Sequence, residues 1–239
     1  MSNYPVNMDV HPVVQAFFDE ATNTISYIVK DPSSNACAIV DSVMDIDYAA
    51  GRISYEQADE IIKYIEDNGL KLEWLIETHV HADHLSAAPY IQQKLGGKIG
   101  IGDKIIVVQE TFGKIFNEGT EFQRDGSQFD ALFKDGDTYT VGQMQAFAMY
   151  TPGHTPACMV HVMGDAAFVG DTLFMPDGGS ARADFPGGDA AIGIGRLGQP
   201  ATPPTGTIAD TVAAPCRVQR YPQPATECQP APEPARSEH

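Results

Sequence analysis

Three histidines and one aspartate lie within six consecutive positions of this chain, in the heptapeptide THVHADH at residues 78–84. Neutral imidazole is a common ligand of zinc, iron and manganese, and a carboxylate adds a charged oxygen donor. In a tight loop, His79 and His81 can reach one metal ion, while Asp83 and His84 can face a second position. A lone histidine is more often a buried, hydrogen-bonded side chain, but this spacing favours a metal site.

Two later motifs provide further ligands of the same kinds. The segment TPGHTP at residues 151–156 places His154 in a turn stiffened by proline and glycine, where a loop on a fixed scaffold can carry function. The segment FVGDT at residues 168–172 places Asp171 at the end of a strand. Each motif alone is an ordinary turn, but their order after the first motif predicts that all three form one site. Asp41, at another strand end, either binds a ligand imidazole or caps a turn.

Strands and helices that could position these residues are visible on both sides of the first motif. Residues 24–29 and 36–40 are apolar and β-prone, and the DPSSN segment between them predicts a hairpin. Residues 54–57 have the form of a capping box, and apolar residues at helical spacing follow as far as Gly69. A strand at 70–77 then leads directly to His79.

The same alternation continues along the chain. We expect a helix at 86–95 and strands at 98–101, 144–150, 157–162 and 166–169. Alternating strands and helices with interspersed hairpins are typical of a layered α/β domain with a mixed sheet.

Composition excludes several classes of protein. The 239 residues include 32 acidic and 15 basic side chains, and this net charge of −17 argues against nucleic-acid binding. No apolar run approaches the roughly 20 residues of a membrane span, and the first residues lack the pattern of a secretory signal. The four cysteines form no CxxC pair. We therefore expect a soluble cytoplasmic protein with neither nucleic-acid nor membrane partners.

Composition also changes near residue 190. More than half of the 17 prolines lie between Pro200 and Pro234, in a segment without apolar periodicity. Such a segment cannot bury enough apolar surface to offset its ordering entropy. We predict a domain at residues 1–190 and a disordered tail at 191–239.

The three motifs in this order resemble the metallo-β-lactamase superfamily, whose fold is an αββα sandwich with metals at one sheet edge. The resemblance covers roughly residues 10–189. Within it, GDTLFMPD at 170–177 and ARADFPGG at 181–188 look like the bacterial persulfide dioxygenases, which are relatives of glyoxalase II.

This resemblance implies a site and a reaction. One Fe(II) ion would be held by His79, His154 and Asp171, the catalytic residues, and would leave positions open for dioxygen and a substrate sulfur. The implied partner is glutathione persulfide, whose terminal sulfur is oxidised to sulfite with release of glutathione. A homodimer is compatible with this reading.

Other residues receive roles from the same resemblance. His81, Asp83 and His84 would orient the iron ligands or serve as spare ligands. Arg182 and Asp184 correspond to residues near the glutathione-binding region, and Arg182 is suited to a bidentate contact with a glutathione carboxylate.

Two alternatives stay open. The first is a zinc-dependent hydrolase of thioester, lactone or β-lactam substrates, in which metal-bound hydroxide attacks a carbonyl. The second is an inactive metal-binding fold, because the helix, strand and histidine-containing loop that the family pattern predicts after residue 190 are replaced by other sequence. We hypothesise that residues from about 191 onward are read in a shifted frame or are an unrelated replacement.

Overall fold

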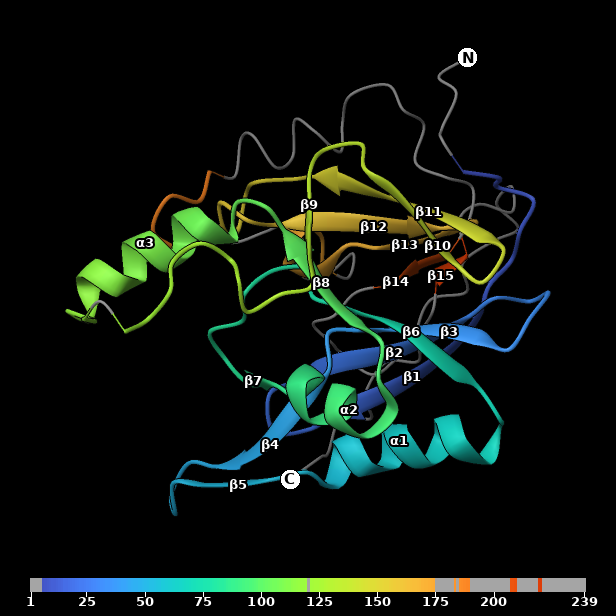
Figure 1. Cartoon of the computed structure of the whole chain (residues 1–239), viewed down its shortest axis with the longest axis horizontal. Coiled ribbons are helices and arrows are strands. Elements are labelled where there is room, and N and C mark those ends of the chain that lie inside the picture. Colours follow the sequence, from blue (N-terminus) through green and yellow to red (C-terminus); the bar gives the residue numbers. More distant parts are fainter. Residues whose placement is uncertain are drawn as a thin grey trace, which may run out of the picture.

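The computed structural model describes residues 6–119, 121–174, 183, 185–189, 207–209 and 219–220. Two large β-sheets face each other (Figure 1). The first has the order β1 (Val13–Asp19), β2 (Thr24–Lys30), β3 (Ala36–Val40), β6 (Lys71–Ile76), β8 (Lys98–Gly102) and β9 (Ala131–Phe133). The second has the order β10 (Thr138–Val141), β11 (Met144–Tyr150), β12 (Met159–Met163), β13 (Ala166–Phe168), β14 (Thr207–Ala209) and β15 (Gln219–Arg220).

Helices lie on the outer side of the first sheet. Figure 1 shows α1 (Glu56–Asp67) and α2 (Ala88–Leu95) below it, and they contact β1, β6 and β8. A small sheet of β5 (Arg52–Ser54), β4 (Val43–Asp47) and β7 (Leu85–Ser86) flanks them. The third helix, α3 (Ile105–Ile115), follows β8 and projects to one side. The first sheet is mixed, as predicted, since β1, β2 and β3 pair antiparallel whereas β3, β6, β8 and β9 pair parallel.

The alternation of side chains along the strands builds two cores. In β2, Ile25, Tyr27 and Val29 point between the two sheets, while Ile28 points toward α1 and α2. Because successive side chains of a strand face opposite sides, both faces of this central strand must be apolar. The core between the sheets therefore sets the distance between them. The second core packs the first sheet against α1 and α2.

Strand ends from both sheets meet at one edge of the sandwich. β3 and β6 are parallel neighbours, so Asp41 and the THVHADH segment leave the sheet side by side. The Thr78 carbonyl accepts a hydrogen bond of 2.8 Å from the Met159 N–H, which joins this edge to the second sheet. The TPGHTP segment follows β11, and the short 3₁₀ turn η1 (Gly170–Thr172) follows β13. All three motifs thus converge at this edge.

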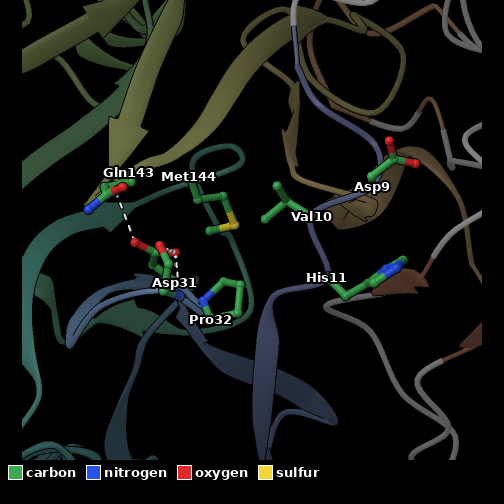
Figure 2. Close-up of a pocket in the computed structure, with 8 residues that line it drawn as sticks. Asp9, Val10, His11, Asp31, Pro32, Gln143 and Met144 are labelled. Carbon is green, nitrogen blue, oxygen red and sulfur yellow. Dashed lines mark hydrogen bonds between the residues drawn. The ribbon is translucent and has the colours of Figure 1, made fainter.

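At the opposite end of the sandwich, Asp31 links a turn of the first sheet to a turn of the second sheet. Its carboxylate accepts hydrogen bonds from the Ser33 and Gln143 N–H groups, both at 2.9 Å, and thereby links the β2–β3 turn to the β10–β11 turn (Figure 2). A cavity of about 340 Å³ lies beside this contact, with Met144 and His11 among its lining residues. No predicted metal ligand lines this cavity, so it is separate from the site described below.

The two ends of α1 test the expectations from the sequence. The predicted end of α1 is confirmed, because Gly69 adopts φ of +60° and its N–H bonds the Glu66 carbonyl. The predicted capping box is wrong. Ser54 ends β5, and the Gln57 N–H is instead bonded by the Asp45 carboxylate of the neighbouring strand at 3.1 Å.

Most of the predicted tail at 191–239, including the hypothesised change of reading frame, lies outside the described residues. Of that segment the structure describes only β14, which pairs parallel with β13, and β15, which pairs with β14. Within the described part of the chain, no helix has the length and apolar composition needed to cross a membrane.

Candidate metal centre

His79, His154 and Asp171 come together from three separate segments. One donor atom from each lies within 4.8 Å of the others. His79 and His154 are 2% and 7% exposed, and their rings are nearly perpendicular with centroids 5.1 Å apart. His154 Nε2 lies 3.5 Å from Asp171 Oδ2. Two imidazoles and one carboxylate therefore face a common point, the arrangement expected of a metal ligand set.

His81, Asp83 and His84 form an adjacent donor group with the same 4.8 Å limit. The His84 side chain is fully buried, and its Nδ1 lies 3.3 Å from Asp83 Oδ1. Its Nε2 has no hydrogen-bond partner among the described residues. A buried nitrogen without a partner is costly, and a bound metal ion is one way to satisfy it.

Asp41 organises the start of the loop that carries His79, His81 and His84. Its Oδ1 accepts a 2.7 Å hydrogen bond from the Thr78 N–H and lies 3.2 Å from His81 Nε2. Its Oδ2 accepts a 2.7 Å hydrogen bond from the Thr78 hydroxyl. The carboxylate thus contacts an imidazole of the motif, which was one of the two roles open for it. Asp41 holds this position with φ of +50°, a conformation that Asp tolerates better than most residues.

The Thr78 hydroxyl determines which nitrogen of His79 is available. Its oxygen lies 3.0 Å from His79 Nδ1. Because the hydroxyl hydrogen is donated to Asp41, the oxygen can accept only from an N–H at Nδ1. This leaves the Nε2 lone pair free to bind a metal, the usual consequence when the other ring nitrogen is hydrogen-bonded.

Burial and neighbouring charges shift the pKa values of this group in different directions. Burial, reinforced by the nearby imidazoles, lowers the pKa of His79 well below its usual value, which favours the neutral, ligating form. Burial opposes protonation of His81, but the charges of Asp41 and Glu77 outweigh it and raise the His81 pKa well above its usual value. Burial raises the pKa of Asp171 although His154 acts in the opposite direction.

Asp83 differs from the other carboxylate donors. Burial acts to raise its pKa, but the hydrogen bond and charge of His84 lower it to about 2. Its side chain is 51% exposed. Asp83 is therefore an ionised and half-exposed carboxylate, which suits the predicted role of a spare ligand.

Gly170 is needed for the close approach of the two sheets. A Cβ atom at this position would overlap the Thr78 hydroxyl and lie 3.4 Å from His79 Nδ1. The residue also has φ of +50°, which favours glycine. Gly170 therefore allows Asp171 to be placed directly against the segment that carries His79.

The predicted substrate residues Arg182 and Asp184 lie outside the described residues. Their described neighbours contact the loop of His154. The Phe185 ring lies 5.8 Å from the His154 ring, and the Asp189 N–H donates to the Gly153 carbonyl at 2.8 Å.

Three residues of the site were missed by the sequence analysis: Glu77, Thr78 and Gly170. Glu77 and Thr78 directly precede His79, so their position at the end of the strand was the available signal. In the Gly-Asp pair at 170–171, only the aspartate was assigned a role from the sequence. The donor set, the burial and the unpartnered His84 nitrogen all fit a bound metal ion.

This geometry agrees with the comparison to a family of known proteins. A model described as the metallo-beta-lactamase superfamily matches residues 21–209. The chain belongs to this superfamily. The predicted fold class is thereby confirmed, and the three donor segments lie together in a member of a superfamily of metal-dependent enzymes.

Individual relatives and a solved structure show how far the likeness extends. A probable metallo-hydrolase of Burkholderia pseudomallei is 54% identical over 187 residues, which cover 74% of this chain and 64% of that protein. The mitochondrial persulfide dioxygenase ETHE1 of Homo sapiens is 27% identical over 180 residues, covering 74% of this chain and 58% of that protein. The chain thus matches less than two thirds of the length of these relatives.

The crystal structure of ETHE1 from Myxococcus xanthus superposes with a TM-score of 0.65 at 21% identity, over 86% of this chain and 78% of that one. At this identity the match supports the shared fold alone. Among the relatives by sequence, ETHE1 has the name of a persulfide dioxygenase, whereas the more similar Burkholderia protein has the name of a hydrolase.

Proposed function

We propose that this protein is an iron(II)-dependent dioxygenase that oxidises glutathione persulfide to sulfite and glutathione. The observation that carries the proposal is the group of His79, His154 and Asp171, whose donor atoms converge within 4.8 Å. Two histidines and one carboxylate on one face are typical of mononuclear iron oxygenases. The relationship to ETHE1, a persulfide dioxygenase, supports the same reaction.

The residues of this chain would hold and orient the reactants. A bound iron(II) ion would supply open coordination positions for dioxygen and for the substrate sulfur. The contact of Thr78 with Nδ1 of His79 leaves Nε2 as the metal donor, and Asp41 fixes Thr78. The overall reaction consumes one dioxygen and one water, and it releases sulfite, glutathione and two protons. Positioning the reactants together is the main task left to the protein.

Substrate binding is proposed for Arg182 and Asp184. Support comes from the neighbouring residues Phe185 and Asp189, which contact the His154 loop. An arginine can pair with a carboxylate of glutathione through two parallel hydrogen bonds. Such a local contact is needed because the chain carries a net charge of −17 and glutathione is itself an anion.

A zinc-dependent hydrolase of thioester, lactone or β-lactam substrates is the second candidate. It is favoured by the name of the Burkholderia relative and by the second donor group of His81, Asp83 and His84. An inactive metal-binding protein is the third candidate.

The test uses the purified full chain, loaded separately with iron(II) and zinc(II). We expect one iron ion per chain and oxygen uptake upon addition of glutathione persulfide, with sulfite as product. His154→Ala should abolish uptake, whereas His11→Ala, which alters an exposed histidine outside the donor groups, should not. Hydrolysis of a glutathione thioester by the zinc form, without oxygen uptake by the iron form, would overturn the proposal. Neither activity, together with a lost near-UV CD signal, would support the inactive alternative.

A further inference from the structure

The outer face of α3 is exposed, although the helix has apolar side chains on every side. Ile105 and Val108 are buried against the domain, in one cluster with Phe185. On the other side of the helix, Val107 is 47% exposed and Ile115 is 57% exposed. A helix that is apolar all round is normally buried all round. The described part of the chain does not cover this outer face of α3.

The exposed apolar surface continues past the end of the helix. Phe116 directly follows α3 and is 67% exposed, and its ring stacks on that of Phe112 with centroids 5.7 Å apart. Phe122 is exposed as well. Figure 1 shows α3 at the side of the domain, away from both large sheets. Contiguous apolar surface of this kind on a folded domain marks an interaction site.

The charges on the outer face indicate what kind of partner fits it. Val107, Glu110 and Lys114 follow one another at helical spacing and therefore form one stripe. Lys114 Nζ lies 2.8 Å from Glu110 Oε1. Residues 104–118 contain two lysines and two glutamates, so this segment is neutral in a chain with a net charge of −17. A second, equally acidic copy of the chain can therefore approach this face with little repulsion.

We propose that α3 is the contact surface of a homodimer, in which the α3 helices of two copies pack antiparallel across a two-fold axis. Such an axis brings one surface against itself, so the surface must be complementary to itself. In the antiparallel arrangement, Glu110 of each copy faces the partner's Lys114, and the exposed Ile106 and Ile115 flank this pair. An eleven-residue helix is only about 16 Å long, so the contact is small and dimerisation should depend on concentration. This inference does not depend on the reaction proposed above.

An exchange of the two charges provides the test, measured by sedimentation velocity on the full chain from micromolar to submillimolar concentration. The wild type should dimerise in this range. Glu110→Lys leaves only positive charges on the stripe, and Lys114→Glu leaves only negative ones. Each variant alone should therefore dimerise at least tenfold more weakly, because like charges then face each other.

An equimolar mixture of these two variants, with one of them fluorescently labelled, should form a mixed dimer about as tightly as the wild type. Both variants lose the same ion pair within their own helix, so only a contact between two α3 helices explains rescue by mixing. A monomeric wild type, dimerisation that is unchanged in either variant, or a mixture as weak as its components would overturn the proposal.

The apolar part of the contact is tested with Val107→Asp, which should abolish dimerisation. The matched control is Ile53→Asp, which alters a similarly exposed apolar residue in β5 and should leave the dimer intact. Urea unfolding of both variants checks that they fold. Equal loss of the dimer in both variants would contradict the proposal. A monomeric wild type that Val107→Asp destabilises would show that another segment of the same chain covers α3 instead.

Discussion

Asp41 accepts two hydrogen bonds from Thr78, one from its backbone N–H and one from its hydroxyl, each 2.7 Å long. The pair joins the end of β3 to the end of β6, immediately before His79. Since the same hydroxyl faces His79 Nδ1, the carboxylate acts on the orientation of His79 through Thr78.

Asp41→Asn should therefore weaken metal binding without removing any of the three candidate ligands His79, His154 and Asp171. The amide keeps the shape and tolerates the positive φ, but it has only one oxygen to accept hydrogen bonds. We expect metal affinity to fall by about 10- to 100-fold, the usual range for residues that orient ligands. A competition titration with a metal-binding dye measures the change. Asp47→Asn, at an exposed position in β4, is the matched control, and an equal loss in both variants would contradict this role of Asp41.

Gly170→Ala should damage the site more than the same change at Gly69. Both residues have positive φ, so both variants incur a similar backbone cost of roughly 1 kcal/mol. A Cβ atom at Gly69 meets nothing within 4 Å, whereas at Gly170 it overlaps the Thr78 hydroxyl. Urea unfolding and metal titration of both variants provide the comparison. We expect only Gly170→Ala to lose metal affinity, and unchanged affinity in that variant would show that Thr78 can move without consequence.

His161 should make the stability of the metal-free protein depend on pH. Burial in the core lowers its pKa from 6.5 to about 4, and its Nδ1 is 2.9 Å from the Tyr139 hydroxyl. Between these two values the unfolded chain binds a proton that the folded protein does not bind. The free energy of unfolding should therefore fall as the pH drops below 6.5, by about 3 kcal/mol at pH 4. Below pH 4 both states are protonated and this loss stops.

The measurement is urea unfolding at several pH values for the wild type and for His161→Gln, which does not titrate. The variant should be less stable at pH 7, but its stability should fall less between pH 6.5 and 4. Parallel curves for the two proteins would show that His161 is not the group responsible.

Asp31→Ala should destabilise the fold and leave the metal site unchanged. The carboxylate receives hydrogen bonds from two turns, and these bonds outweigh the effect of burial to lower its pKa to about 2. Removing it leaves several donors without a partner, at a cost of about 3 kcal/mol. Thermal unfolding and metal titration check both parts. Reduced metal affinity would mean that the contact between the turns also controls the opposite edge. Ser33→Ala, which removes only one of the hydroxyl donors, should have a smaller effect.

The sequence was most informative where local pattern and tertiary structure agree. The apolar spacing of Ala58, Ile61, Ile62 and Ile65 predicted a helix, and all four residues are buried on α1. The β2–β3 hairpin was predicted to within one residue at one strand end, because a polar turn separates two strands that are apolar on both faces.

Long-range contacts were the least predictable. The first turn of α1 is bonded by Asp45, from a strand whose position next to the helix depends on the whole small sheet. Likewise, the contact between His81 and Asp41 joins residues 40 positions apart in the sequence, and it follows from the parallel pairing of β3 with β6. The helix α3 was missed because its apolar residues surround it instead of forming one stripe.

The grouping of His79 with His154 and Asp171 was predicted from the order of motifs and the resemblance to a family. The structure brings these side chains together, while the metal they would bind stays a prediction. Local sequence could not indicate that Glu77 is buried, because a glutamate at a strand end is usually exposed, whereas this side chain contacts Ser86 and His81.

The origin of the three donors in both sheets gives the centre a mechanical role. His79 follows a strand of one sheet, and His154 and Asp171 follow strands of the other. An ion bound to all three would cross-link the two sheets. One sheet could then slide over the other only if a coordination bond broke. Metal release should then be slow and limited by the opening of the protein rather than by the ligands themselves.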